Sequence, residues 1–595
     1  MNNKKIKTMK SKSIIGAALV AIFTLGTTTS CEDMFDIESS RVVYEKNHNL
    51  NSTADSAYTT LGVLKCMQQI ADRYIILGEV RGDMVDINEY TKTSLRNLAE
   101  FNFEDDNEYL NVRDYYAVIN NCNYALAKMD TTLAHNNERV MIDEYAALLG
   151  IRAWTYLQLA INYGKVPYYT NPITTVADSE RDYPMLDVKG LAAELIPQLI
   201  PYIDYDLPVF VQDVKLNKQI FPVLQLVIGD LYLWSGDYAN AVDIYKDYLT
   251  TNSDYNYMYG EGANVEVFRG LMGFNHSSLQ ASIGSIQLSM PIAYNWYSYL
   301  STGVGYENLS YIPMLSSSAE GTVSEVASLF ISTDNTHDLN PSAYYTEICS
   351  NQVYCNPVTA TGSNTTVDRK AYTINTTNGD QRRKYYTMER QSTGEGVTSS
   401  FQYYDKLVSY DINDGVNLEY VTPQINIYRR AIVYLRTAEA LAGVYKETHE
   451  PKAAENAFYM LKDAYKAFFP DGHLLEEQLQ PAFIGVHARG CGDTYLDTTH
   501  YVLTPAAIAL RFQKEEEDIN YNDTINYLDE LIIDELAMEA TLEGNRFGDL
   551  IRFAERRSEP EFLAKRVASR KGSEHMDEEL YNKLLDKANW YLPLK

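Results

Sequence analysis

Apolar side chains recur every three or four positions along several stretches of the chain, which is the spacing that gathers them on one face of an α-helix. The third of these stretches ends near Gly164, with Pro167 beyond it, and both residue types commonly stop helices. The pattern predicts a mostly helical fold, with helices over Ser52 to Leu77, Tyr109 to Met129, Val140 to Tyr163, Leu224 to Leu249, Arg429 to Tyr445 and Ala453 to Ala467.

The fourth stretch contains two predicted helices joined by a tight turn at Ser235-Gly236-Asp237. Gly229 and Tyr232 lie on the first helix, and the second is lined by Tyr238, Ala241 and Tyr245. This arrangement resembles a tetratricopeptide unit, which needs a small residue where its two helices nearly touch. Because one unit cannot bury its own apolar face, about three or more are expected to stack. A simple antiparallel helix hairpin is the alternative.

Residues 251 to 424 are rich in Tyr, Ser, Thr, Asn and Gly and show little helical periodicity. Irregular segments of this length are rare unless they serve a function. We therefore expect four regions: a leader over 1–30, a helical part over 31–250, a loop-rich insertion over 251–424 and a second helical part over 425–595.

The N-terminus has the features of a secretory signal, with five early lysines, an apolar run from Ile14 to Gly26 and small residues before Cys31. The run is shorter than the roughly 20 residues that a membrane-spanning helix needs. Cys31 resembles the lipidated cysteine of a bacterial lipobox, although Thr28 stands where an aliphatic residue is usual. The following Glu32-Asp33 resembles the surface-export signal of Bacteroidetes lipoproteins. An ordinary signal peptide with an unrelated cysteine is the alternative.

Composition narrows the function classes. The formal net charge of −29 disfavours nucleic acid and bare anionic lipid as partners, because both are polyanions. The cysteines and histidines lack zinc-ligand spacing, and no common nucleophile, nucleotide-binding or metalloprotease motif occurs. We therefore expect no enzyme, metal or cofactor, although the many acids leave a glycosidase-type carboxylate pair open. Cys349 and Cys355 are close enough in sequence to bridge a small loop.

Several ordered motifs point to one family. Arg429 to Ala440 resembles an R-x-A-(acid)-V-x-L-x-x-A-E-A helix, with Ile432 in place of the acid, and Glu543 to Arg552 matches E-G-x-R-(aromatic)-x-D-L-x-R. Further matches are Arg81-Gly82-Asp83, Tyr163 to Pro167, Asp380 to Arg383 and Trp590 to Leu594. Together they resemble the SusD/RagB-like nutrient-binding lipoproteins of the outer membrane.

The two longest motifs have a structural interpretation. Glu543, Arg546 and Asp549 are spaced three apart, which would place them on one helix face, and Arg546 can pair with a carboxylate through two hydrogen bonds. Gly544 would let another backbone approach closely. We predict that these residues, with Arg429 and Glu439, hold the fold together and do not contact ligand.

The resemblance implies a SusD-like fold and a role at the cell surface. A lipid anchor on Cys31 would hold the protein on the outer face of the outer membrane. There it would capture a glycan and deliver it to a SusC-type TonB-dependent transporter, with no covalent chemistry. A peptide-binding RagB-type member and a tetratricopeptide scaffold that binds only protein partners are the alternatives.

The insertion contains the candidate ligand contacts. Sugars present C–H faces that stack on aromatic rings and hydroxyls that need polar partners. We predict Trp296 as the first stacking residue, followed by Tyr294, Tyr297, Tyr299 and Tyr257. Packing of these rings against the helices is the alternative.

In the family, the loop equivalent to Glu79 to Tyr90 helps to line the ligand face. The resemblance therefore implies polar ligand contacts from Arg81, Asp83 and Asp86. The overall acidity argues against anionic glycans, unless a local basic patch such as Arg382-Arg383-Lys384 serves them.

Overall fold

The computed structural model describes residues 50–208, 218–251, 308–314, 322–332, 335–359, 367–375, 379–394, 397–404, 406–413, 417–462, 485–491 and 497–594. Apart from Leu50, these residues belong to one unit, Asn51–Lys595, and the description below concerns that unit.

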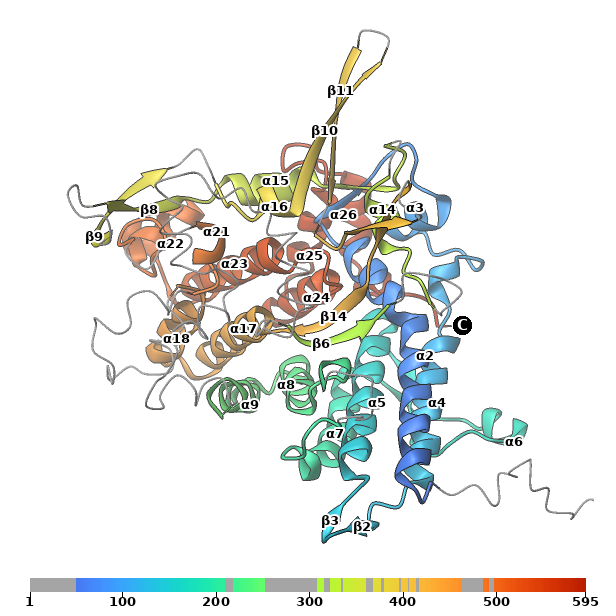
Figure 1. The fold of residues 1–595 in the computed structure, drawn as a ribbon. Coiled ribbons are helices and arrows are strands. Elements are labelled where there is room, and N and C mark those ends of the chain that lie inside the picture. The colour runs from blue at the N-terminus through green and yellow to red at the C-terminus, as the bar shows by residue number, and fades with distance from the viewer. Residues whose placement is uncertain are drawn as a thin grey trace, which may run out of the picture. The chain divides into compact units, whose positions relative to one another are not determined.

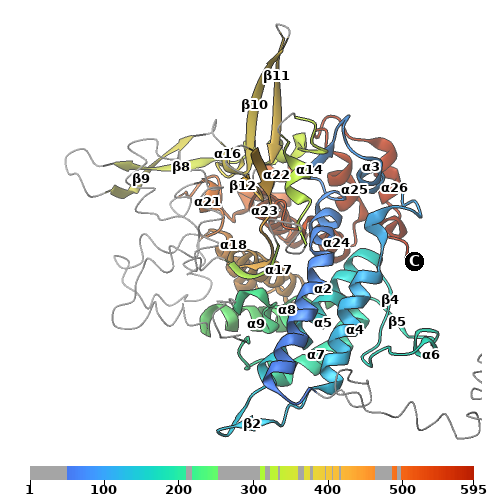
Figure 2. The same ribbon diagram turned by 45° about the vertical axis from the view of Figure 1, so that its right-hand side comes forward.

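Three long helices pack side by side in the N-terminal part of this unit: α2 (Thr53–Glu79), α4 (Arg113–Lys128) and α5 (Ile142–Tyr163), as Figures 1 and 2 both show. Ser52 caps α2, because its hydroxyl accepts a hydrogen bond from the Asp55 amide at 3.2 Å. Helix α5 ends at Gly164, whose φ of 77° suits glycine. The first three predicted helices are thus confirmed, with ends shifted by a few residues.

Helices α8 (Leu224–Ser235) and α9 (Tyr238–Thr251) form the predicted hairpin, with Gly236 at φ 86° in the turn between them. A Cβ atom on Gly229 would lie 2.4 Å from Cε1 of Tyr245, closer than atoms can pack. The Tyr245 ring is held there because its hydroxyl donates to Asp230 Oδ1 at 2.5 Å. The small residue therefore stands where the two helices touch, as in a tetratricopeptide unit.

A second hairpin consists of α17 (Arg430–Thr448) and α18 (Pro451–Lys462), and α17 packs against α9. Helix α7 (Val188–Leu199) packs on both α5 and α8. The C-terminal helices α23 (Tyr521–Ala540) and α24 (Arg546–Arg557) follow, with α17, α23 and α24 close together in Figure 1. Successive helix pairs thus stack and bury one another's apolar faces.

Shorter helices complete the described chain: α3 (Thr93–Ala99), α6 (Val176–Ser179), α14 (Val326–Phe330), α15 (Ala343–Ser350), α16 (Arg383–Tyr386), α21 (Ala488–Cys491), α22 (Pro505–Phe512), α25 (Pro560–Ala568) and α26 (Glu578–Leu584). The 3₁₀ turns are η2 (Glu108–Leu110), η3 (Ile200–Tyr202), η4 (Lys218–Ile220), η6 (Glu516–Asp518) and η7 (Lys587–Trp590).

The strands of the described ranges all occur in antiparallel pairs. Four pairs are short: β1 (Val85–Ile87) with β7 (Leu339–Pro341), β2 (Ala134–His135) with β3 (Glu138–Arg139), β4 (Val166–Pro167) with β5 (Met185–Leu186), and β12 (Ser409–Asn413) with β13 (Asn417–Val421). Three are longer: β6 (Asn308–Pro313) with β14 (Gln424–Arg429), β8 (Tyr354–Thr359) with β9 (Val367–Asn375), and β10 (Thr387–Gly394) with β11 (Val397–Tyr404). Much of the described part of 251–424 is therefore strand, where the sequence analysis expected loops.

The β6–β14 pair brings two distant points of the chain together. Gln424 lies opposite Pro313, and the Met314 amide donates to the Pro423 carbonyl at 2.8 Å. The segment between Met314 and Pro423 therefore begins and ends at adjacent positions of this ladder. Ser310 fastens the ladder to the helices by donating to the Phe221 carbonyl at 2.8 Å.

Buried ion pairs join the strand-rich segment to the C-terminal helices. The Arg429 guanidinium donates to Glu539 Oε1 at 3.0 Å and to both oxygens of Glu543 at 2.7 Å. Lys406 donates to Glu543 Oε1 at 2.5 Å, and Arg382 donates to Glu539 Oε2 at 2.9 Å. Burial disfavours the Glu543 charge, but Arg429 and Lys406 outweigh it and lower the pKa of that carboxyl. Removing one member would leave a buried charge without compensation.

The close contact between α2 and the turn before α24 needs a glycine on each side. Gly544 has φ 79°, and a Cβ atom there would lie 2.7 Å from the Tyr74 carbonyl oxygen. A Cβ on Gly78 of α2 would lie 1.9 Å from the Gly544 carbonyl oxygen. Two backbones thus meet where the sequence predicted a close approach. Because α24 begins only at Arg546, Glu543 lies in this turn, and the prediction that it shares a helix face with Arg546 was wrong.

Candidate ligand-binding site

The aromatic residues predicted to contact ligand, Tyr257, Tyr294, Trp296, Tyr297 and Tyr299, lie outside the described residues. So does the predicted lipid anchor, Cys31. These residues remain predictions.

Arg81 and Asp83 are fully buried, which contradicts the polar ligand contacts expected of them. Arg81 donates to the Leu77 carbonyl at 2.9 Å and to the Trp590 carbonyl at 3.1 Å. Asp83 accepts two hydrogen bonds from Arg546, from Nε at 2.6 Å and from Nη2 at 2.7 Å. Both side chains therefore connect parts of the fold that are distant in sequence, and neither reaches solvent.

Asp86 lies on β1, half-buried, opposite Asn340 of β7. Its ligand role remains a prediction. Arg382 belongs to the basic patch that the sequence suggested for anionic glycans. Its side chain is buried and pairs with Asp380 at 2.6 Å and with Glu535 at 2.6 Å. Arg382 therefore offers no cation at the surface.

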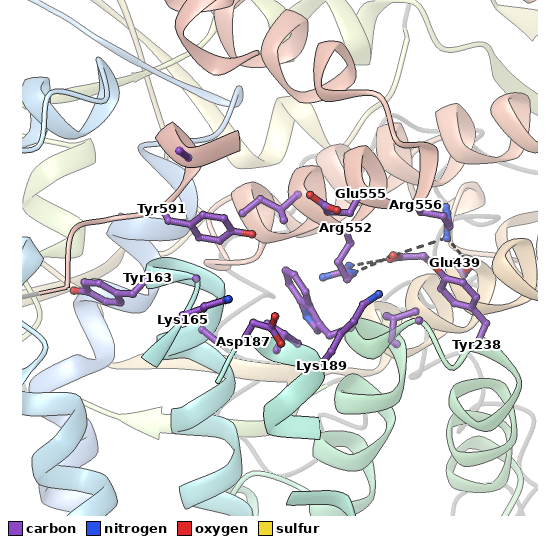
Figure 3. A pocket seen from close by; sticks show the side chains of 18 residues that line it. Tyr163, Lys165, Asp187, Lys189, Tyr238, Glu439, Arg552, Glu555, Arg556 and Tyr591 are labelled. Carbon is purple, nitrogen blue, oxygen red and sulfur yellow. Dashed lines mark hydrogen bonds and ion pairs between the residues drawn. The ribbon is translucent and has the colours of Figure 1, made fainter. Parts of the chain in front are cut away.

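A cavity of about 700 Å³ lies among the helices and is lined from α5, α7, α8, α9, α17, α24 and η7 (Figure 3). We call it the Trp234 cavity. Its aromatic lining is Tyr163, Trp234, Tyr238 and Tyr591, and its charged lining is Lys165, Asp187, Lys189, Glu439, Arg552, Glu555 and Arg556. Volumes of this order and mixed linings are typical of small-molecule sites.

The polar floor of the cavity is a buried cluster on Glu439. Arg552 donates to Glu439 Oε1 at 3.0 Å, to Glu439 Oε2 at 2.8 Å and to Asp549 Oδ1 at 2.6 Å. Arg556 donates to the Glu439 carbonyl at 2.9 Å and pairs with Asp529. Burial disfavours the Arg552 charge, but Glu439 and Asp549 outweigh it and raise its pKa. These charged groups pair with one another, and their hydrogen bonds hold this part of the cavity surface in place.

Trp234, Tyr238 and Tyr591 are the half-exposed rings of the cavity wall. The Arg552 guanidinium lies 4.9 Å from the centre of the Trp234 ring, a cation–π distance that fixes the indole. The Tyr591 ring packs on Gly164, where a Cβ would lie 3.1 Å from Cγ of the tyrosine. Burial first, and then the charges of Glu555 and Asp187, raise the pKa of Tyr591 to about 12.

The C-terminal segment positions Tyr591 because its neighbours are bonded to the first helices. Leu592 donates its amide to the Asn162 carbonyl at 2.9 Å, and the Trp590 carbonyl accepts from Arg81. The indole of Trp590 is buried and donates to the Leu584 carbonyl at 2.8 Å. The motif from Trp590 to Leu594 thus closes one side of the cavity.

Four exposed charged residues line the cavity. Asp187 caps α7 by accepting from the Gly190 amide at 3.0 Å, and Glu555 pairs with Lys587 at 2.8 Å. In Figure 3, Lys165, Asp187 and Lys189 lie along one side, facing Tyr591, Glu555 and Arg552. Neither Lys165 nor Lys189 has a hydrogen-bond or ion-pair partner among the described residues.

Trp234 was not among the ligand contacts predicted from the sequence. The stretch LYLWSGDY predicted only a helix end and a turn. One local signal could have indicated it. A tryptophan in the last turn of a helix, just before a glycine turn, has no later helical residue to cover its ring, so the ring can remain partly exposed. The cavity around it also needs α17, α24 and the C-terminal segment, which lie far away in the sequence, and no local pattern indicates their approach.

Within the described ranges, no group of three or more His, Cys, Asp or Glu side chains is arranged to hold a metal ion. Cys349 is a buried free thiol whose pKa burial raises. None of the helices in the same ranges has both the length and the hydropathy that crossing a membrane requires.

No family model and no curated protein matches the chain. Solved structures do superimpose on it. A SusD homolog from Bacteroides thetaiotaomicron matches with a TM-score of 0.50 at 14% identity, covering 91% of this chain and 94% of its own. A SusD superfamily protein from Bacteroides vulgatus gives 0.49 at 12% identity, over 90% and 92% of the two chains. A SusD-like carbohydrate binding protein from the same organism gives 0.48 at 16% identity, over 84% and 83%.

The first of these matches defines the fold class, a mostly helical scaffold of stacked helix pairs. It is the SusD-like fold, as the sequence motifs predicted.

Proposed function

We propose that the protein is a nutrient-binding lipoprotein of the cell surface, which captures a glycan and passes it to a SusC-type TonB-dependent transporter. The observation that carries the proposal is the SusD-like fold over 91% of the chain, together with the ordered sequence motifs that resemble the same family. Binding and release are sufficient for this role, and no covalent step is part of it.

The proposed ligand face is the segment 251–424, with Trp296 as the main stacking ring. An aromatic ring binds the apolar C–H face of a sugar, and neighbouring polar side chains bind its hydroxyls. Asp86, half-buried on β1, is the remaining polar candidate from the loop before α3.

The proposed location follows from Cys31. Lipidation there would add acyl chains whose buried methylenes each contribute about 0.8 kcal/mol to membrane binding, and several chains on one cysteine give a stable anchor. A tethered protein of this kind would sit beside its transporter at high effective concentration.

The test is a binding screen of the purified full chain against neutral and charged oligosaccharides, with short peptides as a second panel. Saturable binding of at least one oligosaccharide is expected, together with co-purification of a large β-barrel protein from solubilised membranes. Binding of peptides alone would favour the RagB-type alternative. If neither panel binds and only soluble proteins co-purify, the chain is an interaction scaffold and the proposal fails.

A further inference from the structure

The Trp234 cavity is separate from the proposed ligand face in one clear respect. All of its lining residues come from 160–238, 439 and 551–591, and none comes from the segment 251–424. A ligand bound there would contact only the helical framework and the C-terminal segment. The glycan role proposed above assigns nothing to this cavity.

The volume and the lining groups of the cavity suit one or two sugar rings. Its volume of about 700 Å³ is that of a small-molecule pocket and is far too small for a folded partner. Trp234 and Tyr591 provide half-exposed rings for a C–H face, and the neutral Tyr591 hydroxyl can donate to a sugar oxygen. Asp187 and Glu555 provide carboxylate oxygens that can accept from sugar hydroxyls.

The charged groups of the lining that lack a partner indicate the sign of the charge that a ligand would carry. Arg552 and Arg556 are paired with buried carboxylates, Asp187 caps α7, and Glu555 pairs with Lys587. Only the ammonium groups of Lys165 and Lys189, among the charged lining residues, have no partner in the described part of the chain. These two lysines place two positive charges at one cavity of a protein whose net charge is −29.

We propose that the Trp234 cavity binds a saccharide unit that carries one anionic group, a carboxylate or a sulfate, with Lys165 and Lys189 as its counter-charges. The sugar ring lies against Trp234 and Tyr591, and the anionic group pairs with the two ammonium groups. Binding is reversible and electrostatic in part, so it weakens as salt rises.

The experiment compares three ligands of similar size with the purified full chain by calorimetry or ligand-observed NMR: glucuronate, glucose 6-sulfate and glucose. At low salt we expect at least one of the two anions to bind about tenfold more tightly than glucose, as two solvent-exposed charge contacts would give. The pair of anions distinguishes a uronic acid from a sulfated sugar as the preferred group.

Two sets of variants test the assigned residues. The double change Lys165→Gln and Lys189→Gln should reduce the affinity for the preferred anion to that for glucose, without changing thermal stability, because both side chains are exposed. Trp234→Phe should weaken the binding of all three sugars while keeping a ring under Arg552. Lys571→Gln, which removes an exposed lysine outside the cavity, is the matched charge control and should change nothing.

The proposal is overturned if both anions bind no better than glucose, or if the double lysine variant retains the preference. Failure of all three sugars to bind overturns it equally. None of these results bears on the proposed glycan face, because that face is tested by Trp296→Ala, and Trp296 is not among the residues that line the Trp234 cavity.

Discussion

Arg546 shows how single residues hold this fold together. Its guanidinium makes two parallel hydrogen bonds to Asp83, 463 positions earlier in the chain, and a third to the Ile533 carbonyl at 2.7 Å. Both partners of the pair are almost completely buried. Bidentate pairs of this kind are strong and directional, and they cost much to break when they are buried.

We predict that Arg546→Ala lowers the free energy of unfolding by about 3–5 kcal/mol, because it leaves the Asp83 carboxylate buried without its partner. Chemical denaturation measures this loss. Ligand affinity per folded molecule should stay unchanged. The double variant Arg546→Ala, Asp83→Ala should be less destabilised than the sum of the two single variants, and strict additivity would argue against direct coupling.

Glu79 gives a pH dependence with a defined sign. Burial raises the pKa of this carboxyl from 4.5 to about 7, although its Oε1 accepts from the Gly544 amide at 2.8 Å. The folded protein thus holds a proton that the unfolded chain releases, so this contribution to stability is complete below pH 4.5 and is lost as the pH rises towards 7.

Glu79→Gln removes this titration while keeping a carbonyl oxygen for Gly544. We expect the wild type to lose a few kcal/mol of stability relative to the variant between about pH 4.5 and 7, and nothing further above that range. Melting temperatures of both proteins across this range measure the difference. Parallel curves for the two proteins would show that Glu79 does not titrate there.

Trp296→Ala should weaken glycan binding by about 1–3 kcal/mol if its ring stacks on a sugar, since that is the free energy of burying a large apolar side chain. Tyr58→Ala is the control, because Tyr58 is an aromatic residue of α2 with 76% of its surface exposed. Equal affinity of the wild type and a folded Trp296→Ala protein would remove Trp296 from the site.

At the residue scale, the sequence indicated chemistry better than location. It predicted that Arg546 pairs with a carboxylate, but it assigned Asp83, the carboxylate in question, to the ligand face. An Arg-Gly-Asp triplet resembles an exposed turn, and only the approach of α24 makes it part of the core. Contacts across such long separations leave no periodicity that a single sequence can reveal.

At the scale of elements, helices were predictable and strands were not. The helices α2, α5, α8, α9 and α17 begin and end within a few residues of the predicted bounds, because each buries a regular apolar stripe. The strands β10 and β11 carry Thr, Ser and Tyr at many positions, which are compatible with a strand or a loop. The two segments are strands because they pair with each other, and their hydrophobic pattern alone does not indicate this.

The hairpin α8–α9 allows a matched test of packing. Gly229→Ala should destabilise the protein by about 1–3 kcal/mol, because the new methyl group would overlap the fixed Tyr245 ring. Gly62→Ala in α2 makes the same chemical change where nothing lies within 4 Å, and it should stabilise by about 0.5–1 kcal/mol through helix propensity. Thermal denaturation of both variants gives the two signs, and a neutral Gly229→Ala would contradict the close helix contact.

At the scale of the whole molecule, the prediction concerns attachment. Cys31→Ala should move the protein from the membrane fraction to the soluble or secreted fraction, because no acyl chains can then be added. Fractionation of cells followed by detection of the chain measures this. An alanine variant that stays with the membranes would rule out the lipid anchor, whereas Cys66→Ala, a change on α2, should leave the distribution as it is.

The pairing of β6 with β14 has a consequence for how this protein can diversify. A stretch whose two ends emerge from neighbouring hydrogen-bonded positions can be lengthened, shortened or exchanged with little cost in chain entropy, since that cost grows only slowly with length. A transplanted segment joined at Met314 and Pro423 would still need to carry cations in place of Arg382 and Lys406, because these side chains are the buried partners of Glu539 and Glu543.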